Sequence, residues 1–591
     1  MSCKYSRLLI IMPKLSGFFH SMETLAMQEA NNVRLFLISV FAAVLLVACL
    51  PALVSDLQKP IVVKVHGDVL NRIDPRIFGQ FMERPSWAGE IGPEAALIPG
   101  TNTLRPDARD LIRNMQIPIV RFPGGTDVDH VDWLDMIDSV PGRPGGRPVT
   151  IGHTGKPVTN KFGYDEFLRL CEELGIAPLL VVNFRDGLIA AGGPEQAARH
   201  AAKLVAYCNA ETTAELPEDL EVWPRLRVEN GHPKPYGVKY FQIGNETWAF
   251  AGNIRIDKYV AALEAYIEAI HAVDPSVHII VDGKPVRLAS RVHKRLGDRI
   301  SYFAIHLYQP IQINEIRRGN RRVDVENLTA EDIWYNWVSA PGIDSEGQSV
   351  LPKSKYIQAR KKGYKVALTE WNWNGWWASN WRTRSGEPIR QRTPLDSLFA
   401  KGIGAASILH AIMRQGDVVE IANQSMLIGD GWDIHAIYAD RKGRTPAYML
   451  PTGQVTMLYS KHHGRNRLEI EVTNMSYYRQ PYRMGGISPA WGGVGYLDVL
   501  ATRNSNTLYL HTINRHFSRT LSVQIDISEI EKLPETNGTL HILEGRLNNK
   551  PMVGEPLAPG WIREKTFPIS GSQFQVHLPA RTVTVVEVPL Q

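Results

Sequence analysis

The feature that most constrains the fold is a regular alternation of short apolar runs with amphipathic helical segments. The apolar runs predict eight β-strands, at residues 76–83, 118–125, 177–184, 238–246, 278–283, 300–308, 364–372 and 418–427. Such continuous apolar runs are typical of parallel strands that are covered on both faces. Eight strand–helix units over about 350 residues match a closed (β/α)8 barrel, so we predict a TIM barrel at residues 76–437.

The clearest helix is predicted at residues 257–275. Val260, Leu263 and Ile267 share one face there, and Asp257 is placed to cap the start. A doubly wound open sheet is the competing architecture for such a pattern. It is disfavoured because no G-x-G-x-x-G motif follows the first strand.

The periodicity changes after residue 438. Runs at 506–515, 520–528, 538–545, 573–580 and 582–590 alternate with period two between turns rich in Gly, Asn and Pro. This pattern predicts an accessory all-β, jelly-roll-like sandwich at residues 438–591. The strand-like segment within residues 56–75 is expected to join it. The long connection at residues 317–347 is expected to form a lid or wall of the barrel mouth.

The chain begins with a segment that predicts export. Residues 35–50 are apolar apart from Ser39, with Arg34 before them and Pro51 after them, which fits a signal-peptide core better than a membrane span. The sequence LVAC ends at Cys49 and resembles a lipoprotein cleavage box, although a plain cleaved signal or an uncleaved anchor would give the same core. We therefore assign residues 1–55 to export and expect a periplasmic, secreted or lipid-anchored protein. The start is Met1 or Met27.

Charge and cysteine content narrow the range of partners. The formal net charge is +6 over 591 residues, which predicts an ordinary solvated surface and no nucleic-acid partner. Only Cys171 and Cys208 follow the export segment, and neither has the spacing of a zinc site, so no metal or cofactor is expected. Membrane contact is expected only through a lipid anchor at Cys49. Assembly into a homo-oligomer stays open.

Polar side chains begin where the predicted strands end. In a barrel of this kind the carboxyl ends of the strands carry the functional residues. These positions are Glu83, Arg121, Asn183 to Asp186, Asn245, Glu246, His306, Tyr308, Glu370, Trp371 and Asn372.

Two of the carboxylates among these residues, Glu246 and Glu370, are the candidate catalytic acids and would meet at one barrel mouth. Glu246 ends the fourth predicted strand and Glu370 ends the seventh, where it is followed by a cluster of tryptophans. A pair of carboxylates in a cavity lined by Trp is typical of glycoside hydrolysis, because flat aromatic rings pack against the apolar faces of sugars. We therefore predict a glycosidase.

The motifs FGQFMERP, VRFPGGTDVDHVDW, NETW, IHLY and TEWNW occur in this order and resemble those of glycoside hydrolase family 51, mainly α-L-arabinofuranosidases. The resemblance covers nearly the whole chain after the export segment. It implies an exo-acting, retaining enzyme that acts on plant or algal polysaccharides or oligosaccharides. In that mechanism Glu370 is the nucleophile, and Glu246 is the general acid/base with a raised pKa.

The resemblance also implies roles for the other strand-end residues. Asn245 would bond the 2-hydroxyl of the sugar, Glu83 other hydroxyls, and Arg121 would offset the charge of Glu370. Tyr308 and His306 would position Glu370. Trp371, Asn372 and Thr126 complete the expected sugar contacts.

The chain departs from the family pattern at three places. Thr126 stands where the family has a substrate-binding Asn, Arg84 where it has a His, and Met426 where a substrate-binding Gln is expected. The sugar pocket therefore departs more than the catalytic pair. Alternative activities are those of a β-xylosidase or an endo-β-glucanase, and a non-catalytic carbohydrate-binding barrel is the alternative from another class.

Overall fold

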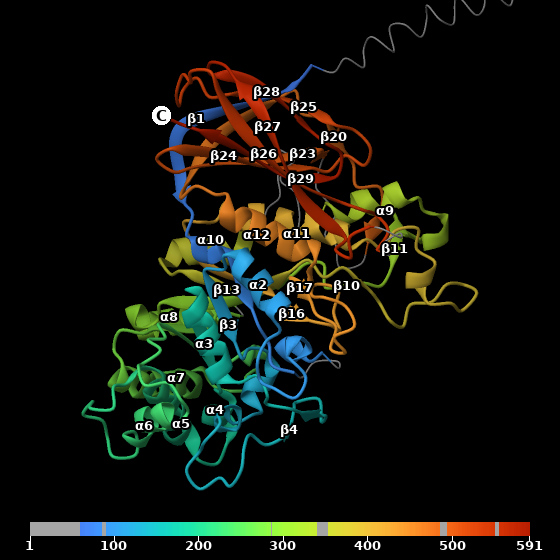
Figure 1. Cartoon of the computed structure of the whole chain (residues 1–591). Coiled ribbons are helices and arrows are strands. Elements are labelled where there is room, and N and C mark those ends of the chain that lie inside the picture. The colour runs from blue at the N-terminus through green and yellow to red at the C-terminus, as the bar shows by residue number, and fades with distance from the viewer. Residues whose placement is uncertain (1–58, 86–89, 285, 340–352, 485–492, 550–554) are drawn as a thin grey trace, which may run out of the picture. The chain divides into compact units, whose positions relative to one another are not determined.

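The computed structural model describes residues 59–85, 90–284, 286–339, 353–484, 493–549 and 555–591 (Figure 1). The predicted export segment, with Cys49, lies outside these residues. None of the helices in the described ranges is long and apolar enough to cross a membrane.

Eight parallel strands close into a barrel, which confirms the predicted (β/α)8 fold. Each of the eight predicted apolar runs contains one of them. The strands are β2 (Gly79–Phe81), β3 (Ile119–Phe122), β6 (Ala177–Val182), β7 (Tyr240–Ile243), β8 (His278–Asp282), β9 (Tyr302–Tyr308), β13 (Val366–Asn372) and β15 (Val419–Ser425), and β15 pairs back onto β2. The competing architecture, a doubly wound open sheet, is therefore excluded.

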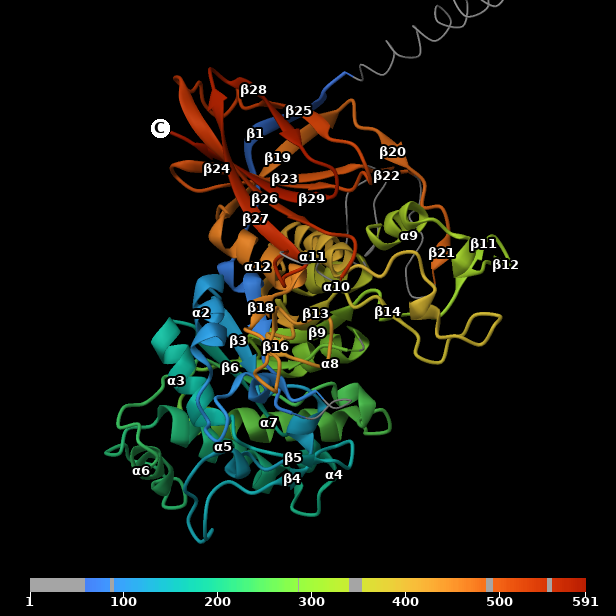
Figure 2. The same ribbon diagram turned by 45° about the vertical axis from the view of Figure 1, so that its right-hand side comes forward.

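Helices cover the outside of the barrel between successive strands (Figures 1 and 2). They are α2 (Pro106–Met115), α3 (Tyr164–Leu174), α5 (Gly193–Asn209), α7 (Ile256–Val273), α8 (Val286–Leu296), α10 (Lys353–Lys362), α11 (Leu398–Met413) and α12 (Pro451–Lys461). The apolar face of α7 is buried as its periodicity predicts. The predicted cap is wrong, because Arg255 occupies the N-cap and Asp257 lies inside the first turn.

A second sheet, of nine strands, is built from β1 and from strands of the C-terminal part of the chain. Its order is β27 (Gly560–Ile569), β26 (Thr536–Gly545), β29 (Thr582–Pro589), β24 (Thr507–Asn514), β23 (Leu497–Arg503), β19 (Asn466–Thr473), β1 (Ile61–Arg72), β25 (Leu521–Asp526) and β28 (Gln573–Leu578). The sheet curls around one apolar core, since Phe567 and Phe574 from its two outermost strands meet with ring centroids 5.7 Å apart. The N-terminal strand β1 pairs with β19 and β25 in its interior.

The connection after β9 forms a small ribbon beside the barrel. It contains β10 (Gln312–Ile313), β11 (Ile316–Arg318) and β12 (Arg321–Arg322), followed by α9 (Ala330–Trp337). β10 pairs with β14 (Trp376–Trp377), and β11 pairs with both β12 and β21 (Arg483–Met484) (Figure 2). The ribbon is therefore built from three distant parts of the sequence.

A buried carboxylate joins the barrel to the nine-stranded sheet. Asp498 on β23 accepts hydrogen bonds from Arg414, at the end of α11, at 2.6 Å, and from Arg515 at 2.8 Å. His410 Nδ1 on α11 lies 3.2 Å from the same carboxylate. Burial opposes ionisation of Asp498, but the charges of Arg414, His410 and Arg515 hold its pKa well below the usual range. The junction thus depends on one anion held between two arginines.

We predict that Asp498→Asn lowers the free energy of unfolding by about 3 kcal/mol, because it leaves the fully buried Arg515 without its counterion. Chemical denaturation at neutral pH measures the loss. Since the folded-state pKa of Asp498 is depressed, its stabilisation is present above the unfolded-state pKa and is lost as the pH falls towards the folded-state value. The exposed Asp298 provides the control, and Asp298→Asn should change the stability by less than about 0.5 kcal/mol. Equal effects of the two variants would refute the prediction.

Candidate active site

A cavity of about 880 Å³ opens at the carboxyl ends of the barrel strands. This is the end of a TIM barrel at which strand-end side chains converge. Among the predicted site residues, its walls contain Glu83, Thr126, Asn245, Glu246, Tyr308 and Glu370. The structure therefore brings together side chains from β2, β3, β7, β9 and β13.

Glu246 and Glu370 face each other across His306. The Nδ1 atom of His306 lies 2.9 Å from Glu246 Oε1 and 3.3 Å from Glu370 Oε2. One carboxylate oxygen from each acid and the His306 nitrogen all lie within 4.8 Å of one another. Glu246 has a left-handed backbone conformation (φ 48°), which is uncommon for a residue other than glycine. The two carboxyl groups are thus close enough to act on one atom placed between them.

Glu370 is held from both sides. Arg121 Nη1 donates to its Oε1 at 2.9 Å, and the Tyr308 hydroxyl donates to its Oε2 at 2.8 Å. Arg121 is fully buried, and its other guanidinium nitrogens donate to Asn245 Oδ1 at 2.6 Å and to Gln242 Oε1 at 3.0 Å. One guanidinium therefore fixes both Glu370 and Asn245, and Arg121 itself does not line the cavity.

The predicted raised pKa of Glu246 is wrong for this structure. Burial raises the pKa of the Glu246 carboxyl, but the hydrogen bond and charge of His306 and the charge of Lys284 outweigh it, so the pKa is lowered. Lys284 lies 4.2 Å from the ring centroid of Trp248, whose edge packs against His306. His306 was predicted at a strand end, whereas Lys284, just beyond the end of β8, was not predicted from the sequence.

Glu83 differs from the two central acids. It is almost fully buried, and burial followed by repulsion from Glu370 raises the pKa of its carboxyl well above the usual value. Its Oε1 atom has no hydrogen-bond partner within the described part of the chain. A Cβ atom at Gly125 would lie 1.5 Å from this oxygen, so only glycine fits beside it. Burial therefore favours the neutral form of the Glu83 carboxyl group, which lines the cavity.

Two predicted sugar contacts are wrong. Trp371 is fully buried and belongs to the core under the helices, because it alternates with Glu370 on β13 and points away from the barrel mouth. Asn372 is also fully buried and donates its amide to the backbone oxygens of Ser425 and Ile434. Both residues shape the strand end without facing the cavity.

Other tryptophans line the cavity instead. Trp376 and Trp377 of the predicted cluster do so, together with Trp432, which the sequence did not single out. Trp376 and Trp432 meet edge to face with centroids 5.8 Å apart, and Trp376 Nε1 donates to Asp433 Oδ1 at 2.9 Å. The aromatic wall therefore comes from two loops, after β13 and after β15.

A buried carboxylate positions the loop that carries Trp432. Glu90 accepts hydrogen bonds from the backbone nitrogens of Asp430, Gly431 and Trp432 at 2.7–3.2 Å. It also lies 2.9 Å from His435 Nε2. Burial raises the pKa of Glu90, but the charge and hydrogen bond of His435 and the backbone donors lower it to about 2. Glu90 is thus an anion that holds the Trp432 loop in place.

The three departures from the family pattern lie in different places. Thr126 and Met426 line the cavity. Arg84 is buried away from it and pairs with Asp127 at 2.5 Å. Gln424 is also buried, between Gln80 and the Thr456 hydroxyl, and does not replace the expected glutamine.

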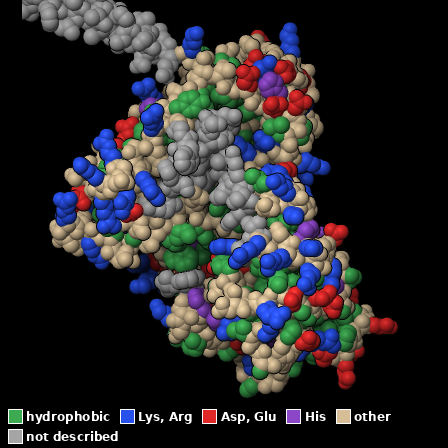
Figure 3. Space-filling view, turned by 180° about the vertical axis from the view of Figure 1, so that it is seen from behind, with side chains coloured by type: hydrophobic (Ala, Val, Ile, Leu, Met, Phe, Trp, Pro, Cys, Tyr) green, Lys and Arg blue, Asp and Glu red, His purple; other side chains and the backbone are tan. Residues whose placement is uncertain are grey.

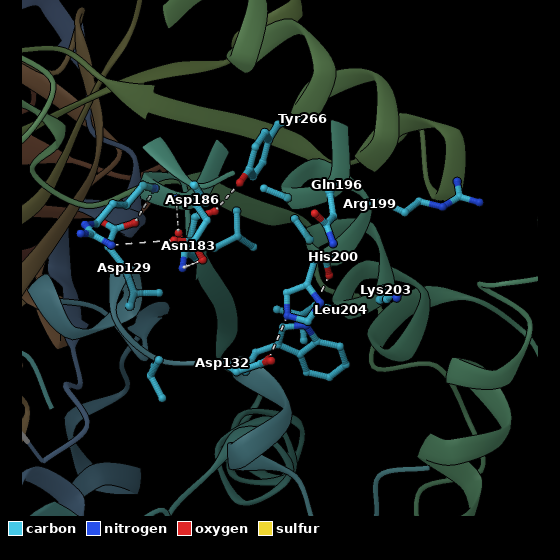
Figure 4. A pocket seen from close by; sticks show the side chains of 18 of the residues that line it. Asp129, Asp132, Asn183, Asp186, Gln196, Arg199, His200, Lys203, Leu204 and Tyr266 are labelled. Carbon is cyan, nitrogen blue, oxygen red and sulfur yellow. Dashed lines mark hydrogen bonds and ion pairs between the residues drawn. The ribbon is translucent and has the colours of Figure 1, made fainter. Parts of the chain in front are cut away.

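A second cavity, of about 610 Å³, is lined by residues 128–133, the end of β6 and α5 (Figure 4). Asn183 and Asp186, which were expected at the barrel mouth, line this cavity instead. They bond to each other, with Asn183 Nδ2 3.0 Å from Asp186 Oδ2. Asp129 lines this second cavity and accepts hydrogen bonds from the backbone nitrogens of Phe184 and Asn245. Burial raises the pKa of Asp129 to about 6. Asp129 therefore connects the second cavity to Asn245, which lines the first.

Two groups of side chains in the described ranges converge closely enough to hold a metal ion. One is Glu246, His306 and Glu370 in the cavity. The other is His462, His541 and Glu587, where both imidazoles contact Glu587 Oε2 at 3.0 and 3.1 Å. In each group the side chains already satisfy one another by hydrogen bonds.

Curated proteins are similar in sequence to this chain over most of its length. The "Intracellular exo-alpha-(1->5)-L-arabinofuranosidase" of Halalkalibacterium halodurans is 25% identical over 488 residues, which cover 78% of this chain and 86% of that protein. The "Intracellular exo-alpha-L-arabinofuranosidase" of Bacteroides ovatus is 26% identical over 434 residues, covering 70% of this chain and 76% of that protein.

These relatives contradict the predicted export. Both are named intracellular enzymes, so an exported location is not supported for a chain that matches them over most of its length. The apolar core of residues 35–50 resembles a signal peptide in composition alone, and that signal was too weak to decide location. The predicted lipid anchor at Cys49 has no support for the same reason.

Family models and a solved structure complete the comparison. The model for the "Alpha-L-arabinofuranosidase 1 domain" matches residues 111–322, and that for the "Alpha-L-arabinofuranosidase C-terminal domain" matches residues 370–581. A glycoside hydrolase family 51 arabinofuranosidase from Thermotoga petrophila shares the fold at 22% identity, with a TM-score of 0.63 over 90% of this chain and 99% of that chain. The chain therefore belongs to the α-L-arabinofuranosidases of glycoside hydrolase family 51 and is a glycosidase.

Proposed function

We propose that this glycosidase is an exo-acting α-L-arabinofuranosidase that retains the anomeric configuration, with Glu370 as nucleophile and Glu246 as general acid/base. The observation that carries the proposal is the position of the two acids, whose carboxylate oxygens lie within 4.8 Å of each other. Retaining glycosidases hold their carboxyl groups about 5–5.5 Å apart, whereas inverting enzymes need a wider gap for a water molecule.

In the first step the Glu370 carboxylate attacks the anomeric carbon. The bond from that carbon to the leaving oxygen breaks, and Glu246 gives its proton to this oxygen. Arg121 and Tyr308 hold Glu370 by both oxygens, so its attack requires little rearrangement. In the second step Glu246 takes a proton from water, and the water oxygen replaces Glu370 at the anomeric carbon.

Glu246 must carry a proton to begin this cycle. His306 opposes this, because its Nδ1 donates to the Glu246 carboxylate. A sugar in the cavity would displace water and strengthen the burial that raises the pKa of Glu246. We infer that substrate entry, through this loss of water, prepares Glu246 as an acid.

The sugar contacts follow from the residues that line the cavity. Asn245 is fixed by Arg121 and is placed to bond the 2-hydroxyl, and the neutral Glu83 carboxyl can donate to a further hydroxyl. Trp376 and Trp432 offer an aromatic wall for the rest of the substrate. Relatives named exo-arabinofuranosidases favour arabinofuranose as the released sugar and an exo mode of action.

Other activities are less well supported. A β-xylosidase or an endo-β-glucanase would use the same pair of acids, and Thr126 with Met426 is where such a preference would arise. A non-catalytic carbohydrate-binding barrel would not require two acids held this close together in its cavity. Assembly into a homo-oligomer stays a prediction.

We predict that Glu370→Gln reduces turnover of nitrophenyl α-L-arabinofuranoside by about 10⁴-fold or more, because the amide cannot form the glycosyl-enzyme. Glu420→Gln is the matched control. Glu420 lies on β15, bound to Tyr302 and Lys365, so its loss should leave turnover within about threefold. Release of another sugar in preference, or an inverted product by NMR, would overturn the proposal.

His306 should set the alkaline limit of activity. His306→Ala removes the hydrogen bond that lowers the pKa of Glu246. Because Glu246 acts as an acid only when protonated, a higher pKa keeps it active to higher pH. The alkaline limb of the kcat/KM profile should therefore move to higher pH, even where the maximum rate falls. A limb that stays in place or moves to lower pH would contradict this role.

Glu90 should control substrate affinity through Trp432. Glu90→Gln replaces one carboxylate oxygen with an NH2 group that opposes the backbone donors of residues 430–432. We expect KM to rise about fivefold with kcat within about twofold, and the free energy of unfolding to fall by about 2 kcal/mol. Steady-state kinetics and denaturation test this. A fall in kcat with KM unchanged would place Glu90 in the chemistry instead.

A further inference from the structure

The small ribbon beside the barrel is strongly basic. Residues 317–322 read RRGNRR, a run that the modest net charge of the whole chain conceals. With Arg483 from β21 they form what we call the arginine ribbon, which consists of Arg317, Arg318, Arg321, Arg322 and Arg483. All are exposed except Arg317, which is half-buried. Figure 3 shows many Lys and Arg side chains on the lobe at the left of that view, where the ribbon of Figure 1 lies.

The pairing in this ribbon places like charges opposite each other. Arg317 is in register with Arg322 on one side and with Arg483 on the other, and Arg318 is in register with Arg321. Because alternate residues of a strand point to opposite faces, Arg317, Arg322 and Arg483 form a row on one face. Like charges directly opposite in a sheet destabilise it. The row therefore has a cost that an anionic ligand would remove.

The chain supplies little negative charge of its own to this face. Glu315 accepts from Arg317 Nε at 2.9 Å. The hydrogen bond of Arg317, with the charges of Arg317, Arg322 and Arg483, lowers the pKa of Glu315, so one carboxylate serves all three arginines. Within the described residues, no ion pair involves Arg322 or Arg483. At least two guanidinium groups in the row can therefore take an external carboxylate in a bidentate pair.

The ribbon begins at the rim of the active-site cavity. Ile311 lines the cavity, and β10 follows it directly and pairs with Trp376 and Trp377, which also line the cavity. β11 starts three residues after β10 ends, at Ile316. An extended ligand that lies along the ribbon is therefore led to the aromatic wall of the cavity.

We propose that the row of Arg317, Arg322 and Arg483 binds an acidic polysaccharide, whose uronic-acid carboxylates lie along the ribbon while a neutral sugar branch enters the cavity. The inference rests on the proposed function, because it names the backbone of that substrate. A polysaccharide is favoured over a nucleic acid or an anionic membrane because the ribbon is continuous with a cavity built for sugar. The ribbon thus binds the backbone of the polymer, and the cavity determines which glycosidic bond is cleaved.

The test compares polygalacturonate with the same polymer after its carboxyl groups have been reduced to alcohols. The full chain should bind the acidic polymer at least about tenfold tighter in affinity electrophoresis at low salt, and added salt should abolish the difference. The triple variant Arg317→Ser, Arg322→Ser and Arg483→Ser should lose about tenfold in affinity for the acidic polymer and none for the neutral one.

A charge-matched variant provides the control. Three exposed arginines serve for this control: Arg225 in α6 (Val222–Glu229), Arg255 at the start of α7 and Arg291 in α8. Their replacement by Ser removes the same number of positive charges from helices instead of from the ribbon. This control should bind within about twofold of the unmodified chain. Both triple variants should unfold at the same denaturant concentration, which excludes a general loss of structure.

The outcomes separate this inference from the proposed function. Equal weakening by both triple variants, or binding of duplex DNA or anionic vesicles as tightly as polygalacturonate, would overturn the docking surface. Turnover of nitrophenyl α-L-arabinofuranoside depends on Glu246 and Glu370 and should be unchanged in the ribbon variant. If the unmodified chain does not hydrolyse this substrate, the proposed function is refuted. Binding of the acidic polymer would then still test the arginine ribbon.

Discussion

The buried guanidinium of Arg121 is the interaction on which the site depends. It is fully buried at the end of β3, and it joins Glu370 on β13 to Asn245 and Gln242 on the β7 side. A charge placed so deep is tolerated only when each donor has a partner. The need to satisfy Arg121 therefore fixes the spacing of side chains that come from strands on opposite sides of the barrel.

His306 adds a second constraint of opposite effect. It lies between the two acids, and its hydrogen bond and charge lower the pKa of Glu246. In the proposed cycle Glu370 must be charged and Glu246 neutral at the start. His306 favours the charged form of Glu246, and a bound sugar would oppose this effect by excluding water. For Glu83 the neutral form is favoured, because the residue is almost fully buried and its Oε1 atom has no hydrogen-bond partner within the described residues.

The sequence predicted the barrel and its convergent strand ends, because apolar runs and the turn to polar residues are local properties of the chain. It could not predict how individual side chains near these strand ends pack. Trp371 and Asn372 belong to β13 and follow Glu370 directly, yet neither lines the cavity, whereas Trp432 reaches it from a loop that Glu90 holds in place. The pKa of Glu246 depends on Lys284 and His306, which are distant in sequence.

The nine-stranded sheet holds both ends of the barrel segment of the chain. β1 lies in the interior of that sheet and precedes the barrel in the sequence, and the other strands of the sheet follow the barrel. Asp498 and its cations then lock α11 against β23, and α11 precedes β15. Beyond the carboxyl end of β15, Glu90 holds the loop that carries Trp432 through its backbone nitrogens. Two buried carboxylates, Asp498 and Glu90, therefore fix the segment before and after β15, and with it the position of the aromatic wall.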